Sequence, residues 1–390
     1  MSGRAWLLLA RSRRASLGHL AKGKPKPGVG RSRRSFGRRS MERPPAGSIA
    51  VDRRSSAPPD APRLEIVMTE IAAPTPSSPL RIVVIGAGQI GSTFASRLSR
   101  NGGHEVTVVA RPGSPRLAQL QRDGAIVDVD GTRAEVRVLD ELDEDTPYDL
   151  VIVTLLAHQV DAILPALSRS AAKCIQFMFN TFDPLRHESV VGAARCTFGM
   201  PFVQAQLDED GRLKATIGAG GQKTLMARQQ WVDVFNAAGL PAAFEPDMPL
   251  WLRCHAPLCV AFESVSIAAM KRGNGASWKE AIRISRGVRA SFDLIKAMGY
   301  PIYPRSKTWL DRSPIVALAG TLWFMSRIRG FRELLATGGA ECEAIIDAIV
   351  LAARLQQRPI DDRIEGMRPS DHGLHSANRG QQGSRPGLHI

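Results

Sequence analysis

Short runs of apolar residues alternate with stretches of helical spacing from Leu80 onward. Within a run the apolar residues are consecutive, which is typical of strands buried on both faces of a sheet. Between the runs, apolar residues three and four positions apart predict helices such as Ser92–Arg100 and Gln159–Ser168. The predicted strands are Leu80–Ile85, Glu105–Ala110, Tyr148–Leu155 and Cys174–Phe179. This alternation predicts an α/β fold with a parallel, doubly wound sheet of the Rossmann type.

Two further segments have the alternating pattern of antiparallel strands. Gly124–Leu139 contains an Asp-Gly pair and is predicted to form a hairpin, and Cys196–Ile217 is predicted to form a second antiparallel pair. Lys223–Ala238 has the spacing of a helix. We therefore expect the Rossmann domain to cover residues 81–245.

The pattern is helical throughout after Pro249. The predicted helices are Trp251–Met270, Ser277–Met298, Ile315–Arg327 and Ala340–Leu355. Ser277 and Glu280 have the spacing of a capping box, which marks the start of the second of these helices. We expect an all-helical domain for substrate binding and dimerisation over residues 246–357, followed by a flexible polar tail over residues 358–390.

The positive charge is concentrated at the N-terminus. The 390 residues carry a net charge of +15, and residues 1–80 contain thirteen Arg and three Lys against five acids. This segment lacks sustained apolar periodicity and is expected to be a disordered basic tail. Three interpretations stay open: a targeting peptide, a nucleic-acid-binding arm, or a start codon upstream of true initiation near Met68. The rest of the chain is nearly balanced, so we expect no nucleic-acid partner for the folded core.

The cysteines and the apolar runs bear on location. The five cysteines are scattered and form no Cys-x-x-Cys pair, so we expect neither disulfides nor a metal site, and a cytoplasmic location. Apolar stretches such as Pro314–Met325 are too short to span a bilayer, and we expect no membrane association.

The strongest chemical signal is the turn Gly86-Ala87-Gly88-Gln89-Ile90-Gly91. It follows an apolar strand and opens a helix, and a second strand comes within thirty residues, as a dinucleotide-binding unit requires. The first glycine permits the tight turn, the second lets the backbone approach a pyrophosphate, and the third allows close helix packing. The helix N-terminus then presents free N–H groups to the phosphates. The alternative is a glycine-rich turn without a ligand.

The end of the second strand bears on which cofactor binds. NAD sites usually place an acid there for the ribose 2′-hydroxyl, whereas this strand ends in Ala110-Arg111. Because Arg111 can pair with a 2′-phosphate, the sequence favours NADPH. The alternative is that Arg111 is an ordinary solvated loop residue.

Together these features resemble the ketopantoate reductase family, whose members join an N-terminal Rossmann domain to a helical domain and use NADPH. The resemblance covers residues 81–355 and rests on short motifs. They are the turn at 86–91, Ala110-Arg111, the segment Val153–Val160 with Leu155 expected at the cofactor, Asn180 after a buried strand, Trp251-Leu252-Arg253, and Gly339-Ala340-Glu341.

The substrate half of the family pattern is altered. In the family, a lysine after the Trp-x pair acts as general acid, and Arg253 stands at the matching position. A guanidinium is a poor proton donor but can orient a carboxylate or stabilise developing negative charge. A second family lysine matches Leu156, and two family asparagines match Pro257 and Ala261. Ketopantoate reduction is therefore not inherited with the fold, and another carbonyl or alcohol is the expected substrate.

Four residues remain as candidates for the active site: Arg253, His255, Asn180 and Glu341. The resemblance implies that Asn180 contacts both cofactor and substrate and that Glu341 accepts hydrogen bonds from substrate hydroxyls. His255 is suited to proton transfer near neutral pH. For His255 to reach the same ligand as Arg253, two positions away, the helix would have to start or kink near Pro257. Simple structural roles stay open for three of them: a packed side chain for His255, a loop cap for Asn180 and a solvated helix face for Glu341.

The sequence thus predicts an NADPH-dependent oxidoreductase of the ketopantoate reductase type that acts on a small-molecule carbonyl or alcohol other than ketopantoate. A non-catalytic NADP(H)-binding sensor is the alternative, because the catalytic lysines and asparagines are missing. The helical domain has enough apolar surface for a homodimer.

Overall fold

The computed structural model describes residues 78–336 and 338–369. The three interpretations of the basic N-terminal segment and most of the predicted C-terminal tail lie outside the described residues. None of the helices in the described ranges is long and apolar enough to cross a membrane.

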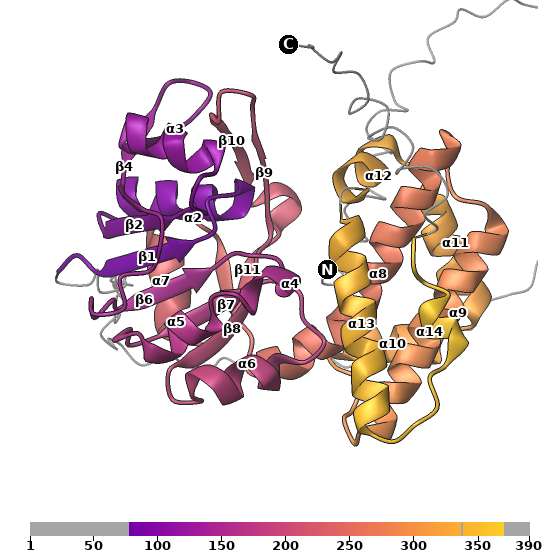
Figure 1. Ribbon diagram of the computed structural model, residues 1–390. Helices are drawn as coiled ribbons and strands as arrows, with labels where there is room; N and C mark the ends of the chain where they lie inside the picture. Colours follow the sequence, from indigo (N-terminus) through magenta and orange to yellow (C-terminus); the bar gives the residue numbers. More distant parts are fainter. Residues whose placement is uncertain (1–77, 337, 370–390) are drawn as a thin grey trace, which may run out of the picture. The chain divides into compact units, whose positions relative to one another are not determined.

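Eight strands form one central sheet, in the order β12-β11-β8-β7-β6-β1-β2-β5 (Figure 1). They are β1 (Arg81–Ile85), β2 (Glu105–Val109), β5 (Arg137–Leu139), β6 (Leu150–Val153), β7 (Ile175–Met178), β8 (Cys196–Met200), β11 (Thr224–Met226) and β12 (Ala242–Phe244). Neighbours pair in parallel, except that β8 and β11 are antiparallel. The strand order reverses between β1 and β6, which is where sheets of this class bind ligands.

Both faces of the sheet are buried, as the apolar strands predict. In β1, Ile82 and Val84 join one buried cluster with Phe94, and Val83 joins a second cluster with Leu167. Each such side chain contributes about 2 kcal/mol when it is buried. The helices of this part are α2 (Gln89–Arg100), α3 (Pro115–Asp123), α4 (Ala157–Val160), α5 (Leu164–Arg169), α6 (Pro184–Val191) and α7 (Gln229–Ala237). The predicted α/β class is thereby confirmed.

The strand pairing predicted for Cys196–Ile217 is wrong in part. β8 belongs to the central sheet beside β7, and the antiparallel pair consists of β9 (Val203–Leu207) and β10 (Leu213–Ile217). The burial pattern explains the difference, because β8 is buried almost throughout whereas β9 alternates between half-buried and exposed positions. A central strand and an exposed ribbon lie next to each other in the sequence with only two residues between them.

Three further element predictions need correction. Lys223–Ala238 is not one helix, since β11 precedes α7, and the short strand β12 that follows was not predicted. Gln159–Ser168 divides into α4 and α5. Within Gly124–Leu139 the predicted hairpin does form, from β3 (Ala125–Val127) and β4 (Arg133–Glu135), but β5 pairs with β2. Elements of three or four residues are too short for their periodicity to be read reliably.

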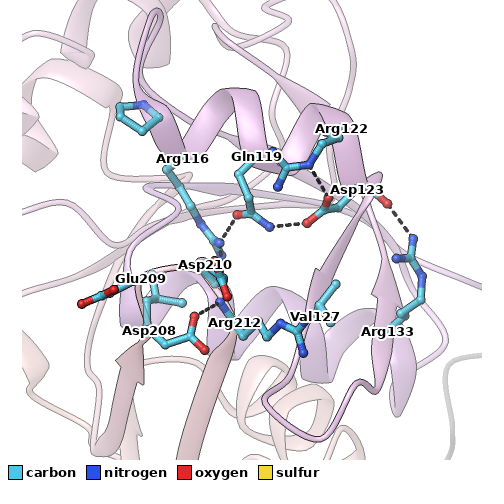
Figure 2. A pocket seen from close by; sticks show the side chains of 13 residues that line it. Arg116, Gln119, Arg122, Asp123, Val127, Arg133, Asp208, Glu209, Asp210 and Arg212 are labelled. Atoms are coloured by element: carbon cyan, nitrogen blue, oxygen red, sulfur yellow. Dashed lines mark hydrogen bonds and ion pairs between the residues drawn. The ribbon is translucent and has the colours of Figure 1, made fainter.

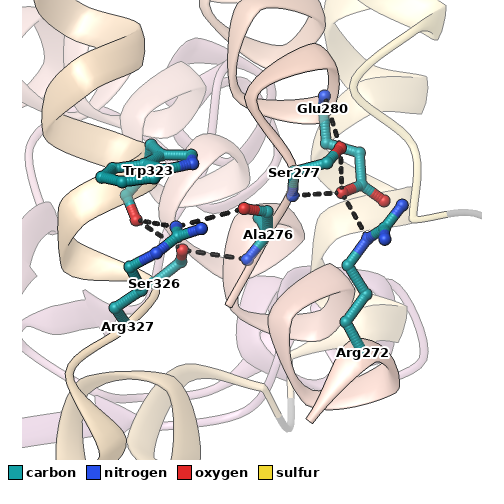
Figure 3. A network of polar contacts seen from close by, with 7 residues as sticks. All are labelled: Arg272, Ala276, Ser277, Glu280, Trp323, Ser326 and Arg327. Atoms are coloured by element: carbon teal, nitrogen blue, oxygen red, sulfur yellow. Dashed lines mark hydrogen bonds and ion pairs between the residues drawn. The ribbon is translucent and has the colours of Figure 1, made fainter. Parts of the chain in front are cut away.

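The second part of the chain is helical, which confirms the predicted class. Its helices are α8 (Met248–Arg272), α9 (Trp278–Ala297), α10 (Arg305–Arg312), α11 (Ile315–Met325), α12 (Arg329–Leu335), α13 (Gly339–Leu355) and α14 (Asp362–Glu365). Figure 3 shows the predicted capping box at the start of α9, where Ser277 Oγ accepts from the backbone N–H of Glu280 and the Glu280 carboxylate accepts from the N–H of Ser277. Beside it, the Arg327 guanidinium lies 3.4 Å from the centre of the Trp323 ring and donates to the Ala276 carbonyl.

Helix α8 runs without a break through Pro257, contrary to the expectation of a helix start or kink there. Its N-terminus lies nine residues earlier, at Met248, where the Asp247 side chain accepts from the N–H of Leu250. Because the helix is continuous, Arg253 and His255 leave it in different directions.

Packing continues past residue 357, the end expected for the helical domain. Ile364 of α14 and Met367 are buried against the helical core. Met367 packs so closely on Gly287 of α9 that an added Cβ would lie 2.2 Å from Met367 Cγ. A glycine at this point of α9 therefore lets the last described segment approach the helix.

Candidate cofactor and active site

The glycine-rich turn has the geometry that a dinucleotide site needs. Gly86 has φ +104°, a conformation that side chains disfavour, and its N–H donates to the Val109 carbonyl across to β2. A Cβ on Gly91 would lie 1.9 Å from the Gly86 oxygen, so only glycine lets α2 start this close to the turn. A Cβ on Gly88 would meet no atom within 4 Å. Gly88 is exposed, so the space over the turn is free for a phosphate group.

The end of β6 lies against this turn. Thr154 Oγ1 donates to the carbonyl oxygens of Ile85 and Gly86, at 3.1 and 2.9 Å. Leu155 Cδ2 comes within 3.0 Å of the Cβ position of Gly86. The structure therefore places Leu155 against the glycine-rich turn, while its contact with a cofactor stays a prediction.

The residues around the turn fit a nicotinamide dinucleotide. The first turn of α2 contains no acid, and its N-cap Gly88 has no side chain to occupy the free N–H groups. Arg111 follows β2 directly and is exposed, and no hydrogen bond or ion pair within the described residues engages its guanidinium. A free guanidinium at the end of β2 is suited to a 2′-phosphate.

Arg116 of α3 connects the turn to a neighbouring cavity. Its Nε donates to the Ala87 carbonyl at 3.1 Å and its Nη2 to Ser92 Oγ at 2.8 Å, while Nη1 donates to the Gly211 carbonyl between β9 and β10. The cavity, of about 800 Å³, lies between α3 and the β9–β10 connection (Figure 2). Its wall contains four arginines and four acids, so it does not by itself indicate an anion site. They are Arg116, Arg122, Arg133, Arg212, Asp123, Asp208, Glu209 and Asp210.

Two of the predicted active-site residues are in direct contact. Asn180, 161 positions before Glu341, donates from Nδ2 to Glu341 Oε1 at 2.9 Å. Asn180 Oδ1 in turn accepts from the Cys259 thiol of α8 at 3.2 Å. Three elements, the end of β7, α8 and α13, thus meet at the carboxyl edge of the sheet. Glu341 is half-buried at the start of α13, where burial raises its pKa and the hydrogen bond from Asn180 partly offsets that effect.

A second buried acid lies next to this group, and sequence reasoning missed it. Glu263 is one helical turn beyond Cys259 and is 8% exposed. Burial, and then the charge of Glu341, raise the pKa of Glu263 to about 8. The Cys342 thiol donates to Glu263 Oε2 at 3.0 Å. An α8 face with a period of four residues, shared by His255, Cys259 and Glu263, was the available sequence signal. No group of His, Cys, Asp and Glu side chains within the described residues could hold a metal ion.

Arg253 is engaged by the protein itself. Its Nε donates to the Phe182 carbonyl at 3.1 Å, and its Nη2 pairs with Asp183 at 3.2 Å. Its guanidinium also lies 4.2 Å from the centre of the Tyr300 ring, and the residue is 4% exposed. Arg253 therefore fixes the loop that follows Asn180.

His255 lies on the other side of α8. Its ring packs against Trp251 with centroids 4.3 Å apart, and its Nδ1 is buried without a hydrogen-bond partner. Burial, and secondarily the charge of Lys307, lower the pKa of His255 well below its usual value, so the imidazole is neutral at neutral pH. Lys307 of α10, which the sequence patterns did not single out, donates from Nζ to the Trp251 carbonyl at 2.8 Å.

The remaining positions of the family pattern differ in exposure. Leu156 is 38% exposed beside the turn, whereas Pro257 and Ala261 are buried inside the helical part. None of these three can supply the hydrogen bonds of the lysine and asparagines that they replace. His158 of α4 is exposed, and its charge lowers the pKa of Glu341, which places it near that carboxyl.

Comparison with known proteins agrees with this architecture. Residues 82–228 match the family model of ketopantoate reductase PanE/ApbA. No curated protein sequence shows a significant match. Similar solved structures include a PanE/ApbA family ketopantoate reductase from Ralstonia eutropha JMP134, with TM-score 0.54, 17% identity and coverage of 73% of this chain and 95% of that chain.

Two other solved structures have the same fold. D-mandelate dehydrogenase in complex with NADH has TM-score 0.55 and 14% identity, covering 73% of this chain and 95% of that chain. The 2-dehydropantoate 2-reductase from Porphyromonas gingivalis W83 has TM-score 0.52 and 14% identity, covering 74% and 98%. Residues 82–228 thus match the model of the ketopantoate reductase PanE/ApbA family, and these solved structures share the fold.

Proposed function

We propose that this protein is an NADPH-dependent oxidoreductase that interconverts a carbonyl and an alcohol, with a small-molecule substrate other than ketopantoate. One observation carries the proposal. Asn180 and Glu341, far apart in the sequence, meet at the carboxyl edge of the sheet, the same edge that carries the turn whose glycines leave room for a phosphate group. The family comprises oxidoreductases that act on CH–OH groups, and the solved relative D-mandelate dehydrogenase binds NADH.

The cofactor would be held by the turn Gly86–Gly91, by Leu155 against Gly86, and by Arg111. When bound, a reduced nicotinamide supplies hydride to a carbonyl carbon. The choice of NADPH over NADH rests on Arg111, whose guanidinium has no partner among the described residues and which follows the strand where an acid would favour NADH.

The substrate would be held at Asn180 and Glu341. Burial raises the pKa of Glu341, and its carboxyl could accept a hydrogen bond from a substrate hydroxyl beside the one it accepts from Asn180. Arg253 would act as a positioning residue, because its guanidinium binds Phe182 and Asp183 in the loop after Asn180. His255 would contribute a neutral imidazole. Departures at Leu156, Pro257 and Ala261 remove the contacts expected for ketopantoate.

The proposal is tested by following absorbance at 340 nm. Purified protein with NADPH is offered a panel of 2-oxo acids, ketones and aldehydes that includes ketopantoate and phenylglyoxylate. We expect NADPH oxidation with at least one panel compound and faster turnover than with ketopantoate. Tight NADPH binding with no turnover of any compound would contradict the enzymatic function and favour the NADP(H) sensor. A cytoplasmic location and a homodimer remain predictions for fractionation and sedimentation experiments.

A further inference from the structure

A buried lysine without an ion partner among the described residues lies against Trp251 of α8, the helix that also carries Cys259. Lys307 is 4% exposed, and its Nζ lies 3.8 Å from the centre of the Trp251 ring in addition to donating to the Trp251 carbonyl. No carboxylate within the described residues forms an ion pair with it. The nearby Glu245 instead accepts from Tyr303 Oη at 2.6 Å. Burying an ammonium without an ion partner costs several kcal/mol, so this arrangement does not serve stability.

A second group with unused hydrogen-bonding capacity also contacts the Trp251 ring. His255 packs on Trp251, and its buried Nδ1 has no hydrogen-bond partner. An ammonium has three N–H groups, and the Trp251 carbonyl takes only one. Two polar groups with unused hydrogen-bonding capacity therefore contact Trp251, which is the arrangement expected for a ligand oxygen rather than for a closed core.

Lys307, Trp251 and His255 are connected to Asn180 through side chains of α8. His255 and Cys259 are four residues apart on α8 and therefore project from the same face of the helix. Cys259 donates to Asn180, and Asn180 donates to Glu341. A row of side chains thus leads along α8 from Lys307 to the acid at the other end of the proposed substrate site.

We propose that Lys307, supplied by α10, is the proton donor to the substrate oxygen, in place of the lysine that α8 lacks. This inference rests on the proposed oxidoreductase function. Arg253 occupies the family position on α8 but is held by Phe182, Asp183 and Tyr300, and a guanidinium is a poor proton donor. Lys307 is the buried ammonium that reaches the same turn of α8 from another helix.

The proton transfer balances in both directions. In reduction, hydride from the reduced nicotinamide joins the carbonyl carbon, the π electron pair moves to oxygen, and that oxygen takes a proton from Lys307 Nζ. The amine is left neutral and regains a proton from water. In oxidation, the neutral amine removes the hydroxyl proton as hydride leaves the carbon.

The electrostatic surroundings suit this role. Burial lowers the pKa of Lys307 to about 7, against the opposing influence of Cys254, Cys259 and Glu245. His255 also lies near Lys307. Burial, and then the charge of Lys307, lower the pKa of His255 well below its usual value. A donor whose pKa is near the working pH transfers protons efficiently in either direction.

The test compares Lys307→Met and Lys307→Gln with the wild-type protein, using NADPH and the panel compound reduced fastest, with phenylglyoxylate tried first. We expect unchanged NADPH affinity and a loss of about 10²- to 10⁴-fold in kcat. Wild-type reduction should decline above about pH 7, where the amine loses its proton, and the variants should lack this decline. Lys296→Met, which removes a partly exposed lysine paired with Asp311, is the matched control and should leave kcat unchanged.

Stability separates this role from a structural one. Because Lys307 has no ion partner, Lys307→Met should be at least as stable as the wild type at pH 7. If the methionine variant does not fold, the glutamine variant decides, since its amide can still donate to the Trp251 carbonyl. Retention of kcat and of the alkaline decline in either folded variant would overturn the inference while the proposed function stands. If the wild type reduces no panel compound, the proposed function fails and this inference fails with it.

Discussion

Replacing Glu263 by glutamine should make the protein more stable at alkaline pH. Glu263 is buried beside a second acid, Glu341, and the Cys342 thiol is the group that donates to its carboxylate. Glutamine has the same shape, keeps an oxygen for the thiol and carries no charge. The substitution therefore removes the cost of ionising a buried group while it preserves the packing around Gly338, whose Cβ position lies 2.4 Å from Glu263 Oε2.

The magnitude follows from the pKa of this carboxyl, which rises from 4.5 to about 8 on folding. Between these two values the unfolded chain is ionised and the folded protein is protonated, so folding takes up a proton and stability falls as the pH rises. At about 1.4 kcal/mol for each pH unit, the full difference corresponds to about 5 kcal/mol. Part of this arises from Glu341, so we expect the variant to gain about 2–4 kcal/mol at pH 8.

The assay is urea unfolding followed by tryptophan fluorescence at pH 5, 6.5 and 8. Wild type and Glu263→Gln should unfold at similar urea concentrations at pH 5, and their midpoints should separate as the pH increases. The control is Glu343→Gln, since Glu343 is exposed on the same helix as Glu341 and should change stability by less than about 0.5 kcal/mol. A variant that is less stable than the wild type at pH 8, or a difference that does not grow with pH, would refute the reasoning.

Four other substitutions test the site. Arg111→Ala should weaken NADPH binding by about 10- to 100-fold and leave NADH binding unchanged, because a charge-assisted hydrogen bond contributes about 1.5–3 kcal/mol. The control is Arg137→Ala on the exposed part of β5, which should change the binding of neither cofactor. Equal losses for both cofactors would argue against a 2′-phosphate contact. Gly88→Ala should fold normally and weaken cofactor binding. Gly91→Ala should weaken binding and also lower the melting temperature, because its Cβ would lie 1.9 Å from a backbone oxygen. Calorimetry measures the melting temperature of each variant, and fluorescence titration measures its cofactor affinity. Asn180→Ala should lower the free energy of unfolding in urea by about 1–3 kcal/mol and reduce turnover, because it leaves the Glu341 carboxyl and the Cys259 thiol unpaired. An unchanged kcat would show that Asn180 has no part in the reaction.

The sequence by itself determined the features whose physical cause is local. The strand at Arg81–Ile85 and the glycine-rich turn were predicted from adjacent residues, and the structure agrees with both, whereas α2 begins at Gln89, three residues before the predicted helix Ser92–Arg100. The same holds for the capping box at Ser277, where both hydrogen bonds join residues three positions apart. Long helices such as α8 were also predictable, because many turns repeat the same spacing.

Tertiary structure decided which short segments became strands. β8, β11 and β12 have five residues or fewer, and their pairing depends on the neighbours that the fold provides. β8 reads as one half of a hairpin in the sequence but lies between β7 and β11, buried on both faces. A short run of apolar residues is compatible with several partners, and burial by the rest of the sheet selects one of them.

Tertiary structure also decided the roles of the charged groups. Motif spacing drew attention to Arg253, yet Phe182, Asp183 and Tyr300 satisfy its guanidinium. Lys307 belongs to no motif, and only the packing of α10 on α8 makes it a buried ammonium without an ion partner. A side chain's protonation depends on its burial and on the charges around it, which come from segments far apart in the chain. The contact between Asn180 and Glu341 arises in the same way, since folding alone brings together two residues 161 positions apart.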